Sequence, residues 1–415
     1  MKDLRSDTRL LVPLLPLIGA FVACVDDRQS STAIVQDSAG VRIVENTTPL
    51  WQEGEGWHLS LEPVVDIGGG DAEENQLFRV AGATRLSDGR IVIANGGSME
   101  LKFYAPNGVH IFNAGGTGGG PGEFQSLGWF YRLGGDSLIV HDFRQRRTSI
   151  LDANGAFGRS FQLQATTDML RPAPAGAFQD GTFLVREGGF AIGARGPTRI
   201  ERPEEEVFRY DASGAVLHTL GSYPGIEFVI APSGGVRPNG ERVIGRSPQH
   251  FGRSTAFFVH GDHLYVGDNA TYEVKVYSLD GELDLLICKQ HAHVAVTQDD
   301  IEALRSETLA RMRTDEVRRR VRQALRERPA AAATMPAFAP EIQIDEVGNL
   351  WVQQYNRPKD KVPRWTVFDQ DGVLLGSLTF PVAFSPLDIG PDYILGVWRD
   401  ADDVEHVRMY ELVKP

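Results

Sequence analysis

Short apolar runs separated by turn residues recur along most of the chain. The stretch from Asp88 to Gly122 shows the unit clearly. Residues 90–94 alternate after an Asp-Gly turn, residues 101–104 form a second apolar run, and Pro106-Asn107-Gly108 leads into a third run at 109–112. Alternating runs of four to eight residues bounded by Gly, Pro, Asn and Asp are typical of β-strands joined in hairpins. The pattern therefore predicts antiparallel β-structure.

The combination of a turn and a short strand occurs six times. An apolar segment precedes each turn, and the first five copies are followed by an apolar strand that ends in an Asn-Gly, Asp-Gly or Ser-Gly turn and then by a further strand-like run. This gives four strands per unit. The six copies are DGRIVIAN (88–95), GDSLIVHD (135–142), DGTFLVRE (180–187), GDHLYVGD (261–268), VGNLWVQQ (347–354) and PDYILGVW (391–398).

Four-stranded units that repeat at about 45 residues match the period of a β-propeller blade. One such sheet has two apolar faces and cannot bury both alone, so blades pack face to face around an axis. We predict an all-β fold, a six-bladed β-propeller of four-stranded antiparallel blades with one helical insertion. Two all-β domains of three units each are the alternative.

The two ends of the chain are expected to meet in one blade. Residues 405–412 supply a third strand of the last unit, after which little chain remains, and residues 41–46, preceded by a turn at 37–40, can supply its outer strand. This pairing would remove free sheet edges. Residues 51–68 then cross toward the first complete unit, with Trp51 and Trp57 covering an end of the core.

The first 24 residues are typical of an export signal. Three basic residues precede Leu10–Ala23, an apolar run too short to span a bilayer. The run ends in Phe-Val-Ala-Cys, which resembles the bacterial lipobox and predicts lipidation of Cys24; an ordinary secretory signal is the alternative. Residues 25–40 are expected to form a polar tether, and 41–415 the propeller. Cys288 is the only other cysteine, so a lipidated Cys24 would leave no disulfide.

Two insertions interrupt the repeats. Residues 224–254 are rich in Gly, Pro and Arg and are predicted to form a loop, either a lid over a ligand or a decoration of the ring. Residues 297–329 are predicted to be helical, with a capping-box start at 297–300 and a break at Thr314-Asp315. Eight arginines give the helical segment a basic side that suits an anionic ligand, lipid headgroups or an acidic partner, or is simply solvated: Arg311, Arg313, Arg318, Arg319, Arg320, Arg322, Arg326 and Arg328.

Strand direction alternates within a blade, so connections divide between two faces. The short Asp-Gly-type turns fall on one face, which we call the tight-turn face. The connections from second to third strand and from blade to blade fall on the other, which we call the loop-rich face. Both insertions belong to the loop-rich face, and long loops on a rigid scaffold are where binding usually occurs.

The chain contains no sequence-local catalytic motif. Cys288, His291 and His293 resemble part of a zinc site, but no fourth ligand is visible nearby. The polar residues that end second strands are expected to surround the mouth of the axial channel, as binding groups or as caps of backbone N–H groups. They are Asn95, His141, Asp142, Arg186, Asp268, Asn269, Gln354, Tyr355 and Arg399.

The glycine-rich loop GGTGGGPGEF (115–124), followed by a strand, a turn and SLIVHD, resembles the NHL repeat, and HDFRQRRTSILDANG (141–155) and GDNATYEVKVYSLDG (267–281) fit its second half. The mature chain further resembles a group of exported bacterial six-bladed propeller lipoproteins. The resemblance implies a propeller fold and a place in the cell envelope. Val25 and Asp26, which follow the cysteine, favour the outer membrane by analogy with lipoprotein sorting, with the domain facing the periplasm or the surface.

A formal net charge of −13 argues against a nucleic-acid partner. We expect a membrane-anchored binding module that presents its loop-rich face, with both insertions as a shared rim, to a small ligand or an envelope protein, without a cofactor. The alternative is a lactonase-like or amidating-lyase-like enzyme with Ca²⁺ or another divalent metal at the channel mouth.

Overall fold

The computed structural model describes residues 32–52, 54–70, 72–166, 172–188, 198–236, 242–326 and 331–415. Residues 32–415 belong to one compact unit. The predicted signal segment with Cys24, residues 25–31 of the predicted tether and Arg328 lie outside the described residues. In the described part of the chain, no helix has the length and apolar character needed to cross a membrane.

Within these residues, six sheets contain four or more strands each, and every unit predicted from the turn motifs corresponds to one of them. The antiparallel strands that build them are, in chain order, β5 (Val80–Arg85), β6 (Ile91–Asn95), β7 (Glu100–Tyr104) and β8 (His110–Gly115); β9 (Leu127–Arg132), β10 (Leu138–Asp142), β11 (Arg147–Leu151) and β12 (Phe157–Phe161); β13 (Ala173–Ala177), β14 (Phe183–Gly188), β16 (Glu204–Tyr210) and β17 (Val216–Pro224); β20 (Thr255–His260), β21 (His263–Asp268), β22 (Glu273–Tyr277) and β23 (Leu283–Lys289); β24 (Ile342–Ile344), β25 (Leu350–Gln353), β26 (Arg364–Phe368) and β27 (Leu374–Thr379); and β28 (Phe384–Ile389), β29 (Tyr393–Arg399) and β30 (Glu405–Val413). Two short 3-10 turns, η1 (Glu73–Asn75) and η2 (Gly134–Asp136), lie in the connections.

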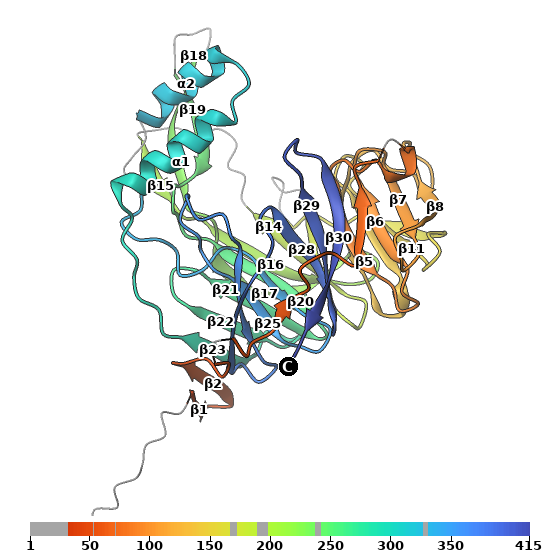
Figure 1. Cartoon of the computed structure of the whole chain (residues 1–415), viewed down its shortest axis with the longest axis horizontal. Helices are drawn as coiled ribbons and strands as arrows, with labels where there is room; N and C mark the ends of the chain where they lie inside the picture. Colours follow the sequence, from red (N-terminus) through yellow and green to blue (C-terminus); the bar gives the residue numbers. More distant parts are fainter. Residues whose placement is uncertain are drawn as a thin grey trace, which may run out of the picture. The chain divides into compact units, whose positions relative to one another are not determined.

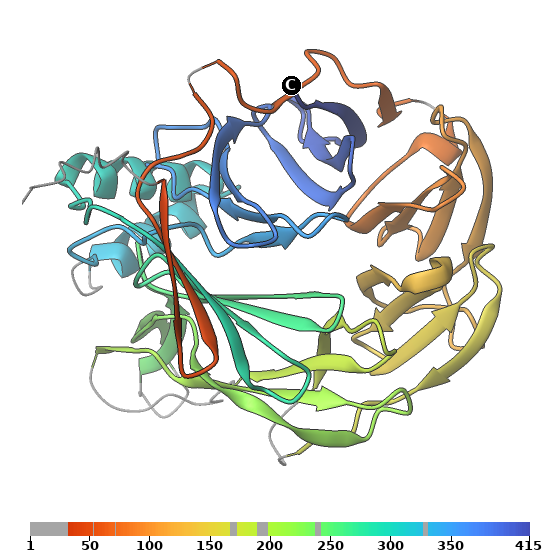
Figure 2. The ribbon, with the colours of Figure 1, turned by 90° about the horizontal axis from the view of Figure 1, so that it is seen from below.

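The sheets follow one another around a common centre, as Figure 2 shows. The first strand of each sheet is innermost: β5 contacts β9 and β28, β13 contacts β9 and β20, and β20 contacts β24. Gln343 of β24 donates a hydrogen bond of 2.9 Å to the Pro386 carbonyl oxygen of β28, which links the remaining pair. The fold is a β-propeller.

Apolar side chains fill the space between neighbouring sheets. Val274 and Ile287 of the β20–β23 sheet pack with Phe338, Val352 and Phe368, which precede or belong to the β24–β27 sheet. All five are almost completely buried. The two apolar faces of each sheet are therefore covered by its neighbours, as the repeat predicts.

The N-terminal segment closes the ring differently from the prediction. Residues 33–38, assigned to the tether, form β1 (Ala33–Ser38), which pairs with β2 (Val41–Asn46). β2 runs parallel to β23, and so extends the β20–β23 sheet rather than the last one. The outer strands of the last sheet are β3 (His58–Leu59) and β4 (Val65–Gly68), which pair with β30. The prediction that residues 41–46 close the last blade is wrong.

Trp51 and Trp57 lie between these two attachments. The centre of the Trp57 ring is 5.2 Å from that of Trp51 and 5.9 Å from that of Trp351. Both tryptophans pack against the apolar cluster shared by the last two sheets. They cover an end of the core, as the sequence predicts.

Residues 224–254, which the sequence predicts to form a loop, contribute two strands to a separate sheet instead. β18 (Phe228–Val236) pairs with β19 (Arg242–Pro248) and with β15 (Arg199–Glu201). β18 and β19 pair with each other within the insertion, and β15, from the β14–β16 connection, adds a third strand. Nothing in the local pattern of 224–254 indicates this partner.

Residues 297–329, expected to be helical, contain α1 (Gln298–Ala310) and α2 (Asp315–Arg326), with the expected capping box at Thr297 and Asp300. α2 contacts both α1 and β18. Figure 1 shows α1, α2, β15, β18 and β19 gathered on one side of the ring. We call this group the insertion module; it brings together the two insertions that the sequence places on the loop-rich face.

Candidate functional site

A cavity of about 260 Å³ lies at the centre of the ring. Its walls come from β5, β9, β20, β24 and β28, the innermost strands of five sheets, and from adjacent residues such as Glu346. Arg132, His260, Glu346 and Asp388 contribute charged or titratable groups to this lining. The axial channel of this propeller is therefore polar.

Asp388 is the hydrogen-bonding centre of the cavity. Its Oδ2 atom accepts hydrogen bonds from Thr84 Oγ1 at 2.9 Å, the Arg85 backbone N–H at 2.8 Å and the Tyr393 hydroxyl at 3.1 Å. Burial raises the pKa of Asp388, although the Arg85 N–H, the Arg132 charge and the Thr84 hydroxyl oppose this rise. Burial also raises the pKa of Tyr393. The pair can hold a proton inside the channel.

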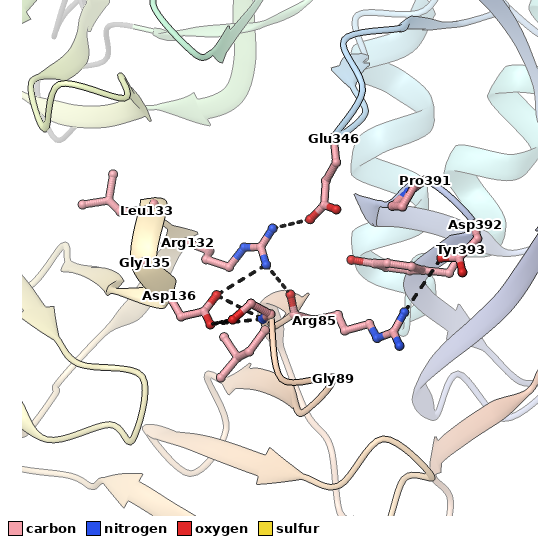
Figure 3. A pocket seen from close by; sticks show the side chains of 13 residues that line it. Arg85, Gly89, Arg132, Leu133, Gly135, Asp136, Glu346, Pro391, Asp392 and Tyr393 are labelled. Carbon is pink, nitrogen blue, oxygen red and sulfur yellow. Dashed lines mark hydrogen bonds and ion pairs between the residues drawn. The ribbon is translucent and has the colours of Figure 1, made fainter.

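A larger cavity of about 500 Å³ opens where the channel meets the tight-turn face (Figure 3). Arg132 donates to the Arg85 carbonyl oxygen at 2.6 Å, pairs with Glu346, and lies 3.6 Å from Asp136. The Arg85 guanidinium lies 4.9 Å from the centre of the Tyr393 ring and 3.9 Å from Asp392. The charged groups of this mouth thus pair with one another and join four sheets.

A third cavity, of about 250 Å³, lies on the loop-rich face at the base of the helical insertion. Residues on the β21–β22 connection, on the segments that enter and leave the helices, and on the β25–β26 connection line it. We call it the insertion-base pocket. Its lining residues are Tyr272, Lys289, His291, Val294, Met335, Pro336, Ala337, Gln354, Tyr355, Arg357 and Thr366.

Backbone contacts fix the walls of the insertion-base pocket. Val296 N–H donates to the Ala333 carbonyl oxygen at 3.0 Å, and Met335 N–H donates to the Val294 carbonyl oxygen at 2.8 Å, so the two ends of the insertion run side by side. Arg357, on the other wall, pairs with Asp300 of the α1 capping box. The pocket and the first helix are therefore held by the same contacts.

Two buried polar atoms in this pocket have no hydrogen-bond partner among the described residues: Tyr272 Oη and His291 Nε2. The Tyr272 side chain is 6% exposed. The nearby Thr366 hydroxyl lowers the pKa of Tyr272 slightly against the effect of burial, without meeting the geometry of a hydrogen bond. Buried polar groups are nearly always satisfied, so these two atoms are the candidate binding groups of the pocket.

Nine residues were predicted to surround the channel mouth, and several of them are held by structural contacts. Asp142 Oδ atoms accept from four backbone N–H groups, those of Gln125, Ser126, Arg144 and Gln145. Burial raises the pKa of Asp142, but these four donors bring it below its usual value. The Asn95 amide oxygen accepts from the Phe78 N–H at 2.8 Å in the same manner.

The other predicted residues are dispersed. His141 is buried beside the Thr148 hydroxyl, at 2.9 Å. Three residues pair within the scaffold, Arg186 with Glu205, Asp268 with Arg202 and Arg399 with Glu405. Asn269 Nδ2 donates to the Phe338 carbonyl oxygen. Among the cavities described above, only the insertion-base pocket includes any of the nine, namely Gln354 and Tyr355.

Apart from His291, Gln354 and Tyr355, sequence reasoning missed the polar groups that line the cavities. Arg132 and Asp388 lie on innermost strands, where a charged residue within an apolar run is the only signal, and Lys289 ends a strand without a motif. Among the described residues, no group of three or more His, Cys, Asp or Glu side chains is placed to hold a metal ion. Cys288, His291 and His293 do not form such a group.

No family model and no curated protein matches this sequence. Solved structures do match. A member of the duf4221 family from Bacteroides vulgatus has a TM-score of 0.51 at 9% identity, over 87% of this chain and 99% of that chain. A candidate exported protein from Bacteroides fragilis has a TM-score of 0.47 at 10% identity (90% and 100%), and a gluconolactonase from Xanthomonas campestris has 0.38 at 13% (86% and 97%). At such identities, the likeness to the Bacteroides vulgatus protein shows a shared fold.

Proposed function

We propose that this chain is an exported binding module, a six-bladed β-propeller that is anchored in the cell envelope through Cys24 and takes a small ligand or a partner protein on its loop-rich face. The observation that carries the proposal is the insertion-base pocket, whose buried Tyr272 Oη and His291 Nε2 atoms lack partners among the described residues. The insertion module stands beside this pocket and adds an accessible basic surface.

Two further features support the loop-rich face over the tight-turn face. The arginines Arg319, Arg320, Arg322 and Arg326 of α2 are exposed, and accessible cationic side chains on a protein of net charge −13 favour acidic ligands or surfaces. At the tight-turn mouth, in contrast, Arg132 and Arg85 are engaged with Glu346, Asp136 and Asp392. Within the described residues, these four arginines make no ion pair, whereas the arginines of the tight-turn mouth are paired.

The export and anchoring parts of the proposal rest on the sequence. The basic start, the apolar run 10–23 and the cysteine that follows it support a lipoprotein signal. Val25 and Asp26, which follow the cysteine, favour the outer membrane by analogy with lipoprotein sorting. Radiolabelled palmitate should enter the wild-type protein and not the Cys24→Ala variant; equal labelling of both would remove the anchor from the proposal.

Position-specific photocrosslinking tests the binding face. A photoreactive residue at Arg320, on α2, is compared in intact cells with one at Asp262, an exposed residue of the β20–β21 turn on the tight-turn face. The proposal predicts crosslinked products, to protein or to a smaller molecule, from position 320 and not from position 262. Products from position 262 alone would place the working face at the other end.

A second candidate function, a hydrolase or lyase, is favoured by one observation: Asp388 and Tyr393 form a hydrogen-bonded pair of groups with raised pKa values inside the channel. A carboxyl whose pKa is raised suits general acid–base chemistry, and the neutral Tyr393 hydroxyl orients it through the hydrogen bond. The sequence-based version of this candidate requires a divalent metal such as Ca²⁺. Elemental analysis of the purified protein tests it, together with stability measured before and after a chelator is added. Stoichiometric metal would support this candidate if the chelator both removes the metal and lowers the stability of the protein.

A further inference from the structure

We infer that the insertion-base pocket binds a small organic anion, with Lys289, Tyr272 and His291 as its donors. This inference rests on the proposed function for its choice of face, and it adds the class of the ligand. It follows from the kinds of groups that the pocket presents, from their burial, and from the absence of described protein partners for them.

The pocket presents hydrogen-bond donors without acidic acceptors. Lys289, Arg357, Tyr272 and His291 line it, and no Asp or Glu is among its described lining residues. Tyr272 Oη is a donor in its neutral form, and His291 Nε2 is a donor in one of its tautomers. A ligand that satisfies these groups must supply acceptors, and a carboxylate or phosphate oxygen is the strongest kind.

Lys289 carries a charge that no described residue balances. Its ammonium lies 4.7 Å from the centre of the Tyr272 ring and makes no hydrogen bond or ion pair within the part of the chain that the structure describes. Burial lowers the pKa of Lys289, and burial together with Lys289, His293 and Arg253 lowers the pKa of His291. A half-buried lysine without a carboxylate is unfavourable by itself, and an anion next to it would remove the penalty.

The other charged groups around the pocket are already engaged. Arg357 pairs with Asp300, and the Arg253 guanidinium donates to the Thr334 hydroxyl at 2.6 Å and to its carbonyl oxygen at 3.1 Å. The Asp300 carboxylate offsets the Arg357 charge, whereas Thr334 gives the Arg253 guanidinium only neutral acceptors, so Arg253 adds to the positive potential that an anion would meet. Lys289 is thus the lining cation that has capacity for a new ion pair.

Size and lining limit the anion further. A cavity of about 250 Å³ lies just below the range of drug-sized ligand pockets, which begins near ~300 Å³. Val294, Met335, Pro336 and Ala337 give the same pocket an apolar part of its lining. The ligand is therefore expected to combine one anionic group with a short apolar part, rather than to be a bare inorganic ion.

Calorimetric titration with sodium butyrate, sodium acetate and sodium phosphate, at equal ionic strength, tests the inference on the full protein. Butyrate should bind saturably and at least ten-fold more tightly than acetate or phosphate. Lys289→Met and Tyr272→Phe should each weaken butyrate binding at least ten-fold. Lys275→Met and Tyr265→Phe, on the same sheet but outside the pocket, should leave it unchanged.

Tyr272→Phe also separates binding from folding. The lost hydroxyl makes no hydrogen bond with a described residue, so the unliganded variant should unfold at the same temperature as the wild type or higher. No saturable binding of any of the three anions, or equal binding by wild type, Lys289→Met and Tyr272→Phe, would overturn the inference. If crosslinks still formed from position 320 in that case, the proposed function would stand without the anion. If an anion bound but no such crosslinks formed, only anion binding by the pocket would stand.

Discussion

Asn46 Nδ2 donates hydrogen bonds to the Gly372 carbonyl oxygen at 2.9 Å and to the Cys288 carbonyl oxygen at 3.0 Å, while Asn46 Oδ1 accepts from the Leu374 N–H at 2.7 Å. One side chain near the N-terminus therefore joins the β20–β23 sheet to the β24–β27 sheet. It is 1% exposed, so each of these bonds is shielded from water.

Replacing this amide tests how firmly the N-terminal hairpin is joined to the ring. Asn46→Ala leaves three buried backbone groups without their partner and should lower the free energy of unfolding by about 2–4 kcal/mol. Asn107→Ala, in an exposed turn, serves as control and should cost less than about 1 kcal/mol. Urea unfolding measures both. Equal small losses would show that the hairpin is held by β2–β23 pairing alone.

The second N-terminal attachment, β4 on β30, is tested by two neighbouring residues. Ile67 is 2% exposed within the cluster between the last and first sheets, so Ile67→Ala should cost about 2–5 kcal/mol through the cavity it leaves. Val64 is 54% exposed, and Val64→Ala should change stability by less than about 0.5 kcal/mol. Thermal unfolding compares the two; similar midpoints would contradict closure of the ring by β4.

His141 makes stability depend on pH. Burial lowers its pKa to about 4, although the negative charge of Asp142 acts to raise it. The unfolded chain takes up this proton near pH 6.5 while the folded protein does not, so stability should be fully present above pH 6.5 and decline toward pH 4. His141→Gln should remove roughly 3 kcal/mol of this decline.

Urea unfolding at a series of pH values between 4 and 7.5 measures the effect. At pH 7.5, above the pKa of His141 in the folded and in the unfolded protein, the variant differs from the wild type only by the lost contact with Thr148. The stability difference at this pH is therefore the reference for the measurements at lower pH. If stability declined with falling pH as steeply in His141→Gln as in the wild type, groups other than His141 would cause the decline.

The helical insertion depends on Asp300. Its Oδ2 accepts from the Thr297 N–H at 2.9 Å and from the Thr297 hydroxyl at 2.6 Å, and it pairs with Arg357. Asp300→Ala should destabilise the start of α1 by about 1 kcal/mol, which corresponds to about five-fold faster amide exchange there. Asp299→Ala, at the exposed neighbouring position, is the control. Hydrogen exchange of the 297–310 peptide that is equal in both would contradict the role of the cap.

The strands could be predicted from the sequence because their signals are local. Gly108 and Gly372 both have a φ of +83°, a conformation that glycine adopts readily, and turns of this kind define the hairpins. Ring closure could not be predicted in detail, because β2 pairs with a strand about 240 residues away through a parallel register. Several strands of this chain could accept that edge, and only the packed ring selects one.

The candidate site was harder to predict than the fold. Tyr272, Met335 and Tyr355 come from three different connections and Lys289 from the end of β23, and they meet only after the sheets close, so no spacing in the sequence relates them. The sequence did predict binding residues among the polar side chains at the ends of second strands. Asp142 and Asn95 illustrate why that signal is ambiguous: a short polar side chain after a strand bonds the backbone of nearby connections equally well.

Arginine footprinting measures whether the loop-rich face is the binding face. Arg319, Arg320 and Arg322 on α2 and Arg159 on the outer strand β12 are all exposed. We expect an arginine-selective reagent to modify the three α2 residues more slowly in native envelopes than in the purified protein, while Arg159 reacts equally in both. Equal reactivity of α2 in the two samples, with protection at Arg159 instead, would contradict it.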